Sequence, residues 1–160
     1  MQIQTMKGKK KEYLFTCYYP KYAAEWIVTF QTLFGERTEK IITAGDGITN
    51  QQGIIDGLPA CETIEVQNEA IIPYEVEKQE FQEQGKETLR KYFLYQRRSW
   101  KVPVVKRENT YIFYAPYQIE NAKKFNSNKV KVMLYEVSSE SYDKLEKFPI
   151  IQRFYQERGA

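Results

Sequence analysis

The residues best suited to do chemistry lie at positions 92 to 114, in the stretch YFLYQRRSWKVPVVKRENTYIFY, which holds seven aromatic and five cationic side chains. Lys and Arg neutralise phosphates, and uncovered rings stack on nucleic-acid bases. Tyr, Trp and Arg also dominate binding at protein interfaces. The pattern predicts a binding surface, and its candidate residues in this stretch are Tyr95, Arg97, Arg98, Trp100, Lys101, Lys106, Arg107 and Tyr111.

The positive region continues beyond this stretch. A turn expected at residues 126–128 places four lysines close together along the chain. Residues 1–90 carry a net charge of 10 − 14 = −4, whereas residues 91–160 carry 14 − 7 = +7. This asymmetry steers an anionic partner toward the carboxyl-terminal half if the fold keeps the halves apart. The additional candidate residues are Tyr117, Lys123, Lys124, Lys129 and Lys131.

A purely structural interpretation of the same stretch stays open. Rings such as Tyr92 and Phe93 would then build the core, while their charged neighbours face water and keep the surface soluble. No aromatic RNA-recognition signature, KH loop, zinc finger or helix-turn-helix pattern marks a known nucleic-acid module. The functional interpretation therefore depends on whether rings and cations meet at one uncovered surface.

Missing residue types exclude several kinds of catalysis. The chain has no His, which removes Ser-His-Asp and Cys-His nucleophile arrangements and most zinc sites. Its two cysteines, Cys17 and Cys61, lie far apart in sequence, and we expect two free thiols in a reducing compartment. Cys17 sits in an aromatic strand pattern with no base near it in sequence, so we expect it to be buried and inert.

A glycine-rich segment at residues 43–57, TAGDGITNQQGIIDG, is the other stretch that could hold a ligand. It has neither the lysine of a phosphate-binding Walker loop nor a complete dinucleotide fingerprint, so we interpret it as a turn-rich connection and expect no cofactor. An alternative is a weak Mg²⁺ site made by Asp46, Asp56 and Glu62. No catalytic residues are predicted, and we expect a protein that is not an enzyme.

Hydrophobic periodicity predicts the helices that would position these residues. Apolar residues at intervals of three and four predict a helix over residues 22–34, ended by Gly35. A longer helix is expected over residues 74–98, where Gly85 marks a close contact or a break. Shorter helices are expected over residues 117–125 and, in two pieces around Pro149, from residue 140 onward.

Strands are expected where β-branched and aromatic residues gather between turn signals. They cover residues 12–19, 38–44, 61–67 and 129–137, and a hairpin joins residues 102–105 to residues 110–114. A basic tail at residues 1–11 precedes a single α+β domain at residues 12–160. Its sheet should be mostly antiparallel or mixed with helices packed on it, and its first six elements suit a ferredoxin-like arrangement.

Apolar runs are too short for a membrane span, and the amino terminus lacks the features of a secretory signal, so we expect a cytoplasmic protein without a membrane partner. The leading hypothesis is a small non-catalytic binding protein that contacts single-stranded or structured nucleic acid through its basic, aromatic carboxyl-terminal half. The alternative is a protein-interaction module or inhibitor that uses exposed Tyr, Arg and Trp side chains and binds an acidic protein partner.

Overall fold

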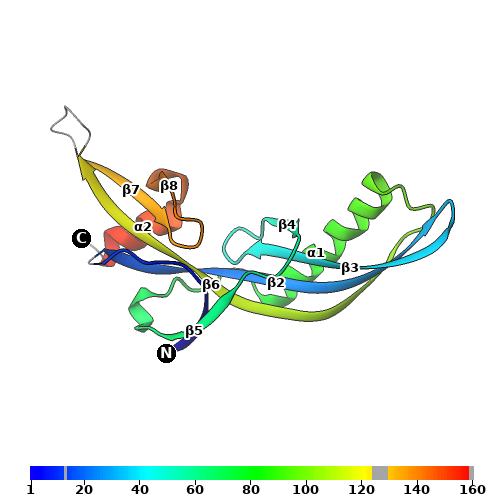
Figure 1. Cartoon of the computed structure of the whole chain (residues 1–160), viewed down its shortest axis with the longest axis horizontal. Helices are drawn as coiled ribbons and strands as arrows, with labels where there is room; N and C mark the ends of the chain where they lie inside the picture. The colour runs from blue at the N-terminus through cyan, green and yellow to red at the C-terminus, as the bar shows by residue number, and fades with distance from the viewer. Residues whose placement is uncertain (13, 124–129, 159–160) are drawn as a thin grey trace. The chain divides into compact units, whose positions relative to one another are not determined.

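The chain folds as a mixed α+β protein in a computed structural model that describes residues 1–12, 14–123 and 130–158 (Figure 1). This is the α+β class that the sequence predicts; within those residues the sheet has eight strands and there are two α-helices, more strands and fewer helices than expected. The elements are β1 (Gln2–Met6), β2 (Phe15–Thr32), β3 (Gly35–Asp46), β4 (Gln52–Ile55), β5 (Cys61–Glu65), α1 (Lys78–Lys91), β6 (Val104–Lys123), β7 (Val130–Glu136), β8 (Ser141–Lys144) and α2 (Pro149–Arg158).

The sheet is mixed but largely antiparallel. Its strand order is β4-β3-β2-β6-β1-β5, with β7 pairing β6 and β8 pairing β7. β1 and β6 pair in parallel through Thr5 and Tyr114, whereas β2–β3, β3–β4, β1–β5, β6–β7 and β7–β8 are antiparallel. A ferredoxin-like arrangement of the first six elements is not confirmed, because the first expected helix is a strand.

The chain forms two compact units that share the long strands β2 and β6. Unit 1 contains Met1–Pro20, Ala60–Pro73 and Phe113–Ala160, and unit 2 contains Lys21–Pro59 and Tyr74–Ile112. Each unit therefore combines segments that are far apart in the sequence. The two units are described in turn below.

The core of unit 2 is formed by one face of β2 packed against α1. Alternate residues from Tyr22 to Phe30, with Trp26 at the centre, are buried with Phe81 and Leu89 of the helix. The expected helix over residues 22–34 is therefore wrong. The burial of every second residue is typical of a strand, and most of these positions hold β-branched or aromatic residues, which favour an extended chain.

The helix expected over residues 74–98 is confirmed in part. α1 covers Lys78–Lys91 and continues as one π-helical turn, Tyr92–Gln96. Gly85 lies in the interior of α1 and is buried against the sheet, where a Cβ atom would meet the Trp26 ring at 2.9 Å. Glycine at this position lets the helix approach the sheet closely.

β6 is one continuous strand, which corrects two expectations. β6 contains residues 104–114 of the predicted hairpin and residues 117–123 of the predicted helix, whose residues 124–125 lie outside the described part of the chain. Pro20 and Pro116 would each be expected to end a strand, but both lie where the neighbouring strand changes. Pro116 stands between the pairing of β6 with β1 at Tyr114 and its pairing with β7 from Tyr117 onward, so its missing N–H does not interrupt either ladder.

β2 runs through Pro20 for the same reason. Tyr18 bridges Ile71, and the pairing with β3 begins at Lys21. The expectation that the first strand stops at Pro20 is therefore wrong. The glycine-rich segment is also more ordered than expected, because the end of β3 and all of β4 form an antiparallel pair within it, with Gly53 opposite Ala44.

In unit 1, the segment expected as a basic tail contains β1, which pairs with β5 along its whole length. β5 takes the edge position that its polar sequence suggests, and β7 confirms the strand predicted over residues 129–137. The terminal segment differs from expectation, since its first part is β8 and only Pro149–Arg158 is α-helical. The turn expected at residues 126–128 lies outside the described residues.

Replacing Gly85 with Ala tests the contact between α1 and β2. Alanine favours a helix by about 1 kcal/mol, but overpacking a core costs roughly 1–3 kcal/mol. We expect Gly85→Ala to lower the free energy of unfolding by about 1 kcal/mol, measured by urea denaturation. Gln84→Ala, at an exposed position of the same helix, is the control. A Gly85→Ala protein more stable than wild type would contradict the close packing.

Candidate functional site: an exposed apolar and cationic tip

Large apolar side chains gather at one end of unit 2. They come from the β2–β3 turn, from the π-helical turn after α1, and from the segment that leads into β6 (Figure 1). Six of these side chains are 64–88% exposed to solvent. A group of exposed apolar side chains is unusual at the surface of a monomeric protein. With two neighbouring cations they define the tip surface: Leu33, Phe34, Tyr95, Arg98, Trp100, Lys101, Val102 and Val104.

Backbone hydrogen bonds hold two of these segments together. The Trp100 N–H donates to the Gln31 carbonyl at 3.2 Å, next to the end of β2. In return, the Gln31 N–H donates to Ser99 Oγ at 3.3 Å, and that hydroxyl donates to the Lys101 carbonyl at 2.6 Å. Ser99 is itself buried. The loop is therefore fixed beside the strand that carries the β2–β3 turn.

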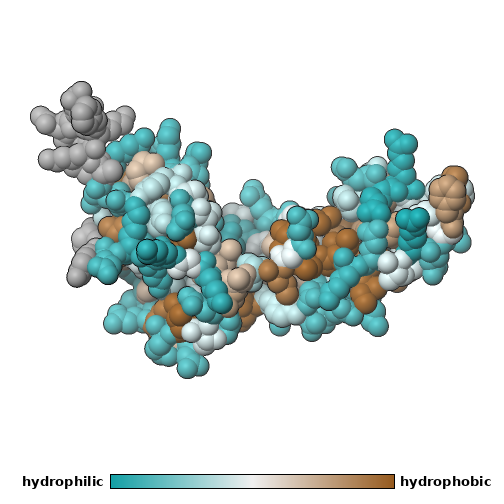
Figure 2. Space-filling model, viewed as in Figure 1, coloured by the Kyte–Doolittle hydropathy of each residue, from teal (hydrophilic) through white to brown (hydrophobic). Residues whose placement is uncertain are grey.

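The β2–β3 turn presents two apolar side chains to solvent. Thr32 pairs with Gly35, whose φ of +113° suits glycine and closes the turn around Leu33 and Phe34. The Thr32 hydroxyl donates to the Gly35 carbonyl and accepts from the Phe34 N–H. Figure 2 shows hydrophobic atoms at this turn, surrounded by hydrophilic ones.

The segment after α1 has an unusual backbone. The Arg97 N–H donates to the Tyr92 carbonyl, which closes a π-helical turn, and Arg98 has a φ of +53°. A non-glycine residue in this left-handed region costs on the order of 1 kcal/mol. Both features occur directly before Trp100, and together they turn the chain from the helix into the exposed loop.

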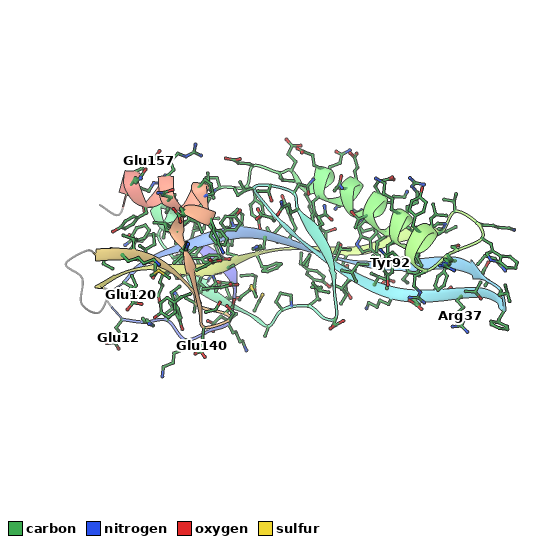
Figure 3. All side chains as sticks on the ribbon, turned by 90° about the horizontal axis from the view of Figure 1, so that it is seen from above. Glu12, Arg37, Tyr92, Glu120, Glu140 and Glu157 are labelled. Carbon is green, nitrogen blue, oxygen red and sulfur yellow. The ribbon has the colours of Figure 1, made fainter. Side chains whose placement is uncertain are left out.

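Arg97 is structural. Its guanidinium makes a two-point ion pair with Glu39 of β3, at 2.8 and 3.1 Å, and lies over the rings of Phe30 and Phe93. Figure 3 labels Tyr92 and Arg37, which mark the end of α1 and the neighbouring part of β3. Arg97 thus clamps the helix end to the sheet, and its charge is already balanced.

The remaining predicted cations of unit 2 are exposed. Arg98, Lys101, Lys106 and Arg107 make no ion pair within the part of the chain that the structure describes. Lys106 and Arg107 belong to the beginning of β6, just beyond the tip surface. These cations can therefore meet an anionic group of a partner without first breaking a salt bridge.

Tyr111 is tied into a polar cluster. Its hydroxyl donates to the carboxylate of Glu25, which also pairs with Lys40 at 2.7 Å. Hydrogen bonds from Lys40 and Tyr111 lower the pKa of Glu25, and the hydrogen bond to Glu25 raises the pKa of Tyr111. A carboxyl group with a lowered pKa is a poor general acid, so the cluster serves stability.

The other predicted residues belong to unit 1. Tyr117 is buried and its ring contacts those of Tyr19 and Phe148. Lys131 of β7 is half-buried next to a pocket in unit 1, and Lys123 is described by its backbone alone. Lys124 and Lys129 lie outside the described residues.

Charge separation along the chain does not carry over to the units. Unit 1 has a net charge of 12 − 10 = +2 and unit 2 has 12 − 11 = +1. The fold interleaves the acidic and basic halves, so a long-range field does not single out one unit. At the tip surface, however, cations and exposed rings still lie near one another.

The residues that sequence reasoning missed are the aliphatic ones and the β2–β3 turn. The helix expected over residues 22–34 contains Leu33 and Phe34, and the hairpin strand expected at residues 102–105 contains Val104. The signal for the turn is present in the sequence: a Gly at position 35 follows a period-2 pattern and precedes another β-favouring segment. Exposure of the valines has no comparable sequence signal.

The groups considered for catalysis have structural roles. Cys17 is fully buried, as predicted, and burial raises the pKa of its thiol to about 12, which disfavours the reactive thiolate. Asp46 accepts the backbone N–H groups of Ile48 and Thr49 and thereby stabilises the β3–β4 turn. Among the described residues, no group of three His, Cys, Asp or Glu side chains could hold a metal ion.

Comparison with known protein families, curated proteins and solved structures finds no match. Among the described residues, no helix is long and apolar enough to cross a membrane.

The Glu25 cluster predicts a pH-dependent contribution to stability. Because the folded state lowers the pKa of Glu25, its ionised form stabilises the fold above the ordinary Glu pKa of about 4.3, and this contribution is lost as the pH falls through the folded value. We expect Glu25→Gln to lower the midpoint of urea unfolding at pH 7 and to lower it less at pH 3. Glu36→Gln is an exposed control on β3. An equal loss at both pH values would contradict this account.

The two thiols should differ in reactivity. Cys17 is buried with a pKa of about 12, whereas Cys61 is only partly buried, although burial raises its pKa as well. At pH 8 we expect a thiol reagent to modify Cys61 in the folded protein and Cys17 only after denaturation, as mass spectrometry of peptides would show. Modification of Cys17 at a similar rate in the folded protein would disprove its burial.

Proposed function

We propose that this chain is a non-catalytic protein-binding module whose partner docks on the tip surface. The observation that carries the proposal is the gathering of six exposed apolar side chains at one end of unit 2. Exposure of such a group to water is unfavourable, so covering it lowers the free energy, and such a group is typical of a surface that another macromolecule covers. Trp100, Tyr95 and Arg98 are of the residue types that most often dominate protein interfaces.

The surface is held in place before a partner arrives. Trp100 is fixed by its bond to Gln31, the loop by Ser99, and the helix end by the Arg97–Glu39 ion pair. A preorganised surface loses less conformational entropy on binding than a flexible one. Arg98 and Lys101, which lie beside the rings and have no ion pair with any described residue, favour a partner with an apolar contact area and an acidic rim.

The open edge of β6 supports a protein partner in particular. β6 lies next to β2 in the sheet, and among the described residues no strand is recorded on the other side of Val104–Ile112. Backbone groups at such an edge can pair with an extended segment of another protein. This edge begins at the tip surface, so one partner can contact both.

Binding to single-stranded or structured nucleic acid is the second candidate. Tyr95 and Trp100 are uncovered, and Arg98 and Lys101 follow or flank them without an ion pair among the described residues. Rings and cations in this combination suit bases and phosphates. The aliphatic Leu33, Val102 and Val104 favour the protein partner, because they offer nothing to a phosphate.

Affinity capture on the immobilised chain, followed by measurement with the purified partner, tests the proposal. We expect Trp100→Ala to weaken binding at least tenfold, about 1.4 kcal/mol, because an exposed Trp at the centre of an interface is a typical hot spot. Leu58→Ala removes an exposed apolar side chain elsewhere in unit 2 and should leave the affinity unchanged. Equal affinities for wild type and Trp100→Ala would refute the assignment.

Arg98→Gly separates binding from stability. Glycine adopts a positive φ without strain, so we expect this change to leave the melting temperature unchanged or to raise it. Loss of the guanidinium should nevertheless weaken partner binding. A variant that binds as well as wild type would show that Arg98 lies outside the interface.

Fluorescence anisotropy with mixed-sequence single and double strands at two salt concentrations distinguishes the second candidate. Nucleic-acid binding would weaken steeply as salt increases, because bound phosphates release counterions. We expect no such binding at physiological salt. Salt-sensitive binding that Trp100→Ala reduces would establish the nucleic-acid role in place of the protein partner.

A further inference from the structure

An open groove of about 340 Å³ lies between α1 and the beginning of β6 in unit 2. Val105 and Arg107 line it from the strand, and Trp26 of β2 also contributes to its lining. The helix lines it with residues at intervals of three and four, which share one face of a helix: Gln79, Gln82, Glu83 and Lys86. The groove therefore has a helix on one side and a strand on the other.

The strand that borders this groove is also the one with an open edge. Among the described residues, no strand is recorded beyond β6 along Val104–Ile112, on the side away from β2. An edge strand presents a row of backbone N–H and C=O groups that have no partner in the sheet. A further strand could therefore pair with β6, and one face of that strand would be turned toward α1.

The two walls of the groove are held together. The side-chain amide of Gln82 in α1 donates to the Thr110 hydroxyl of β6 at 3.0 Å. The helix itself is packed on β2 at Gly85, where a Cβ atom would meet the Trp26 ring at 2.9 Å. A groove that is formed in advance loses less conformational entropy on binding than a flexible one.

The groove carries two cations that a partner can reach. Lys86 and Arg107 are exposed, and neither makes an ion pair with any residue that the structure describes. Glu83 also lines the groove, and its carboxylate accepts a hydrogen bond from the Gln79 amide at 3.2 Å. Acidic side chains that enter the groove would therefore meet two cations without first breaking a salt bridge.

The opposite face of the same edge is apolar where β6 begins. Successive residues of a strand point to opposite faces, so Val104 lies on the other face from Val105. The Val104 side chain is 66% exposed and belongs to the tip surface. An added strand would therefore place alternate side chains beside cations and beside apolar surface. A second copy of β6 fits this pattern poorly, because it would bring its own Lys106 and Arg107 to an edge that already carries them.

We propose that an extended segment of the partner protein, with alternating acidic and apolar side chains, adds to the edge of β6 as a further strand. The inference rests on the proposed function, because it specifies how a protein partner binds unit 2. The backbone of the segment pairs with Val104–Ile112. Its acidic side chains enter the groove beside Lys86 and Arg107, and its apolar side chains lie on the opposite face beside Val104.

The peptide Glu-Val-Glu-Val-Glu-Val-Glu, blocked at both ends and labelled with fluorescein, is the probe for this site. Fluorescence anisotropy with the full chain should show binding that weakens as salt increases and that is lost when Lys replaces every Glu of the peptide. Methylation of the backbone nitrogen of every Val, or of every Glu, removes the N–H groups from one edge of the extended peptide or from the other. We expect only one of these two methylated peptides to bind. Equal binding by the two, or no binding by the parent peptide at millimolar concentration, would refute strand addition.

Variants of the chain locate the site. Lys86→Gln and Arg107→Gln should each weaken peptide binding about threefold, the effect expected for an exposed ion pair. Arg37→Gln, which removes an exposed cation of β3, should leave the affinity unchanged. Circular dichroism of each variant verifies that it is folded. An equal effect of all three substitutions would show that the peptide responds only to net charge, and would overturn the proposal.

Trp100→Ala separates this inference from the proposed function. Trp100 does not line the groove, so the variant should bind the peptide as tightly as wild type, although its affinity for the whole partner should fall. Loss of peptide binding in Trp100→Ala would place the peptide on the tip surface and overturn the groove as its site. Sedimentation velocity of the chain alone tests the second copy: a dimer that the peptide dissociates would show that β6 pairs with itself, and would also overturn the proposal.

Discussion

The packing of α1 against one face of β2 is the constraint on which the rest of unit 2 depends. Trp26 stands at the centre of this contact, buried under the helix at Gly85 and hydrogen-bonded through its indole N–H to the Thr43 hydroxyl at 2.8 Å. Burying each large apolar side chain of this face contributes roughly 1.5–3 kcal/mol. The contact fixes the position of the helix. It therefore also fixes where the residues after the π-helical turn lie beside the end of β2.

The tip surface follows from this arrangement. The helix ends beside the β2–β3 turn, Arg97 locks that end to Glu39, and the next residues form an exposed loop bonded to Gln31. The core and the tip surface therefore use neighbouring residues of one segment: Phe93 is buried, whereas Tyr95 is exposed. Unit 1 has a different arrangement, in which β7, the β8 region and α2 surround a pocket of about 390 Å³.

The sequence predicts the fold class, α1, β5 and β7, because each has a pattern with one physical interpretation. The segment from Tyr22 to Phe34 has two, since its apolar residues fit intervals of three and four as well as alternate positions. Only the neighbouring strand β3 decides between them, and its pairing is a long-range contact. Pro20 and Pro116 misled for a similar reason, because a proline interrupts a strand only where its N–H would have met a partner.

The candidate site was predictable in composition but not in extent. The stretch from Tyr95 to Lys101 could be identified by residue type. The burial of the Tyr117 side chain and the ion pair of Arg97 could not, because they depend on residues elsewhere in the chain. Leu33 and Phe34 join the site only because β2 and β3 form a hairpin.

Acrylamide quenching of tryptophan fluorescence tests the central claim most directly, since the chain has two tryptophans, the buried Trp26 and the exposed Trp100. In the absence of a partner, one emission component should be accessible to the quencher and the other protected. Saturation with the bound macromolecule should protect the accessible component. If that component stays equally accessible in the complex, the partner binds elsewhere and the tip surface is not the interface.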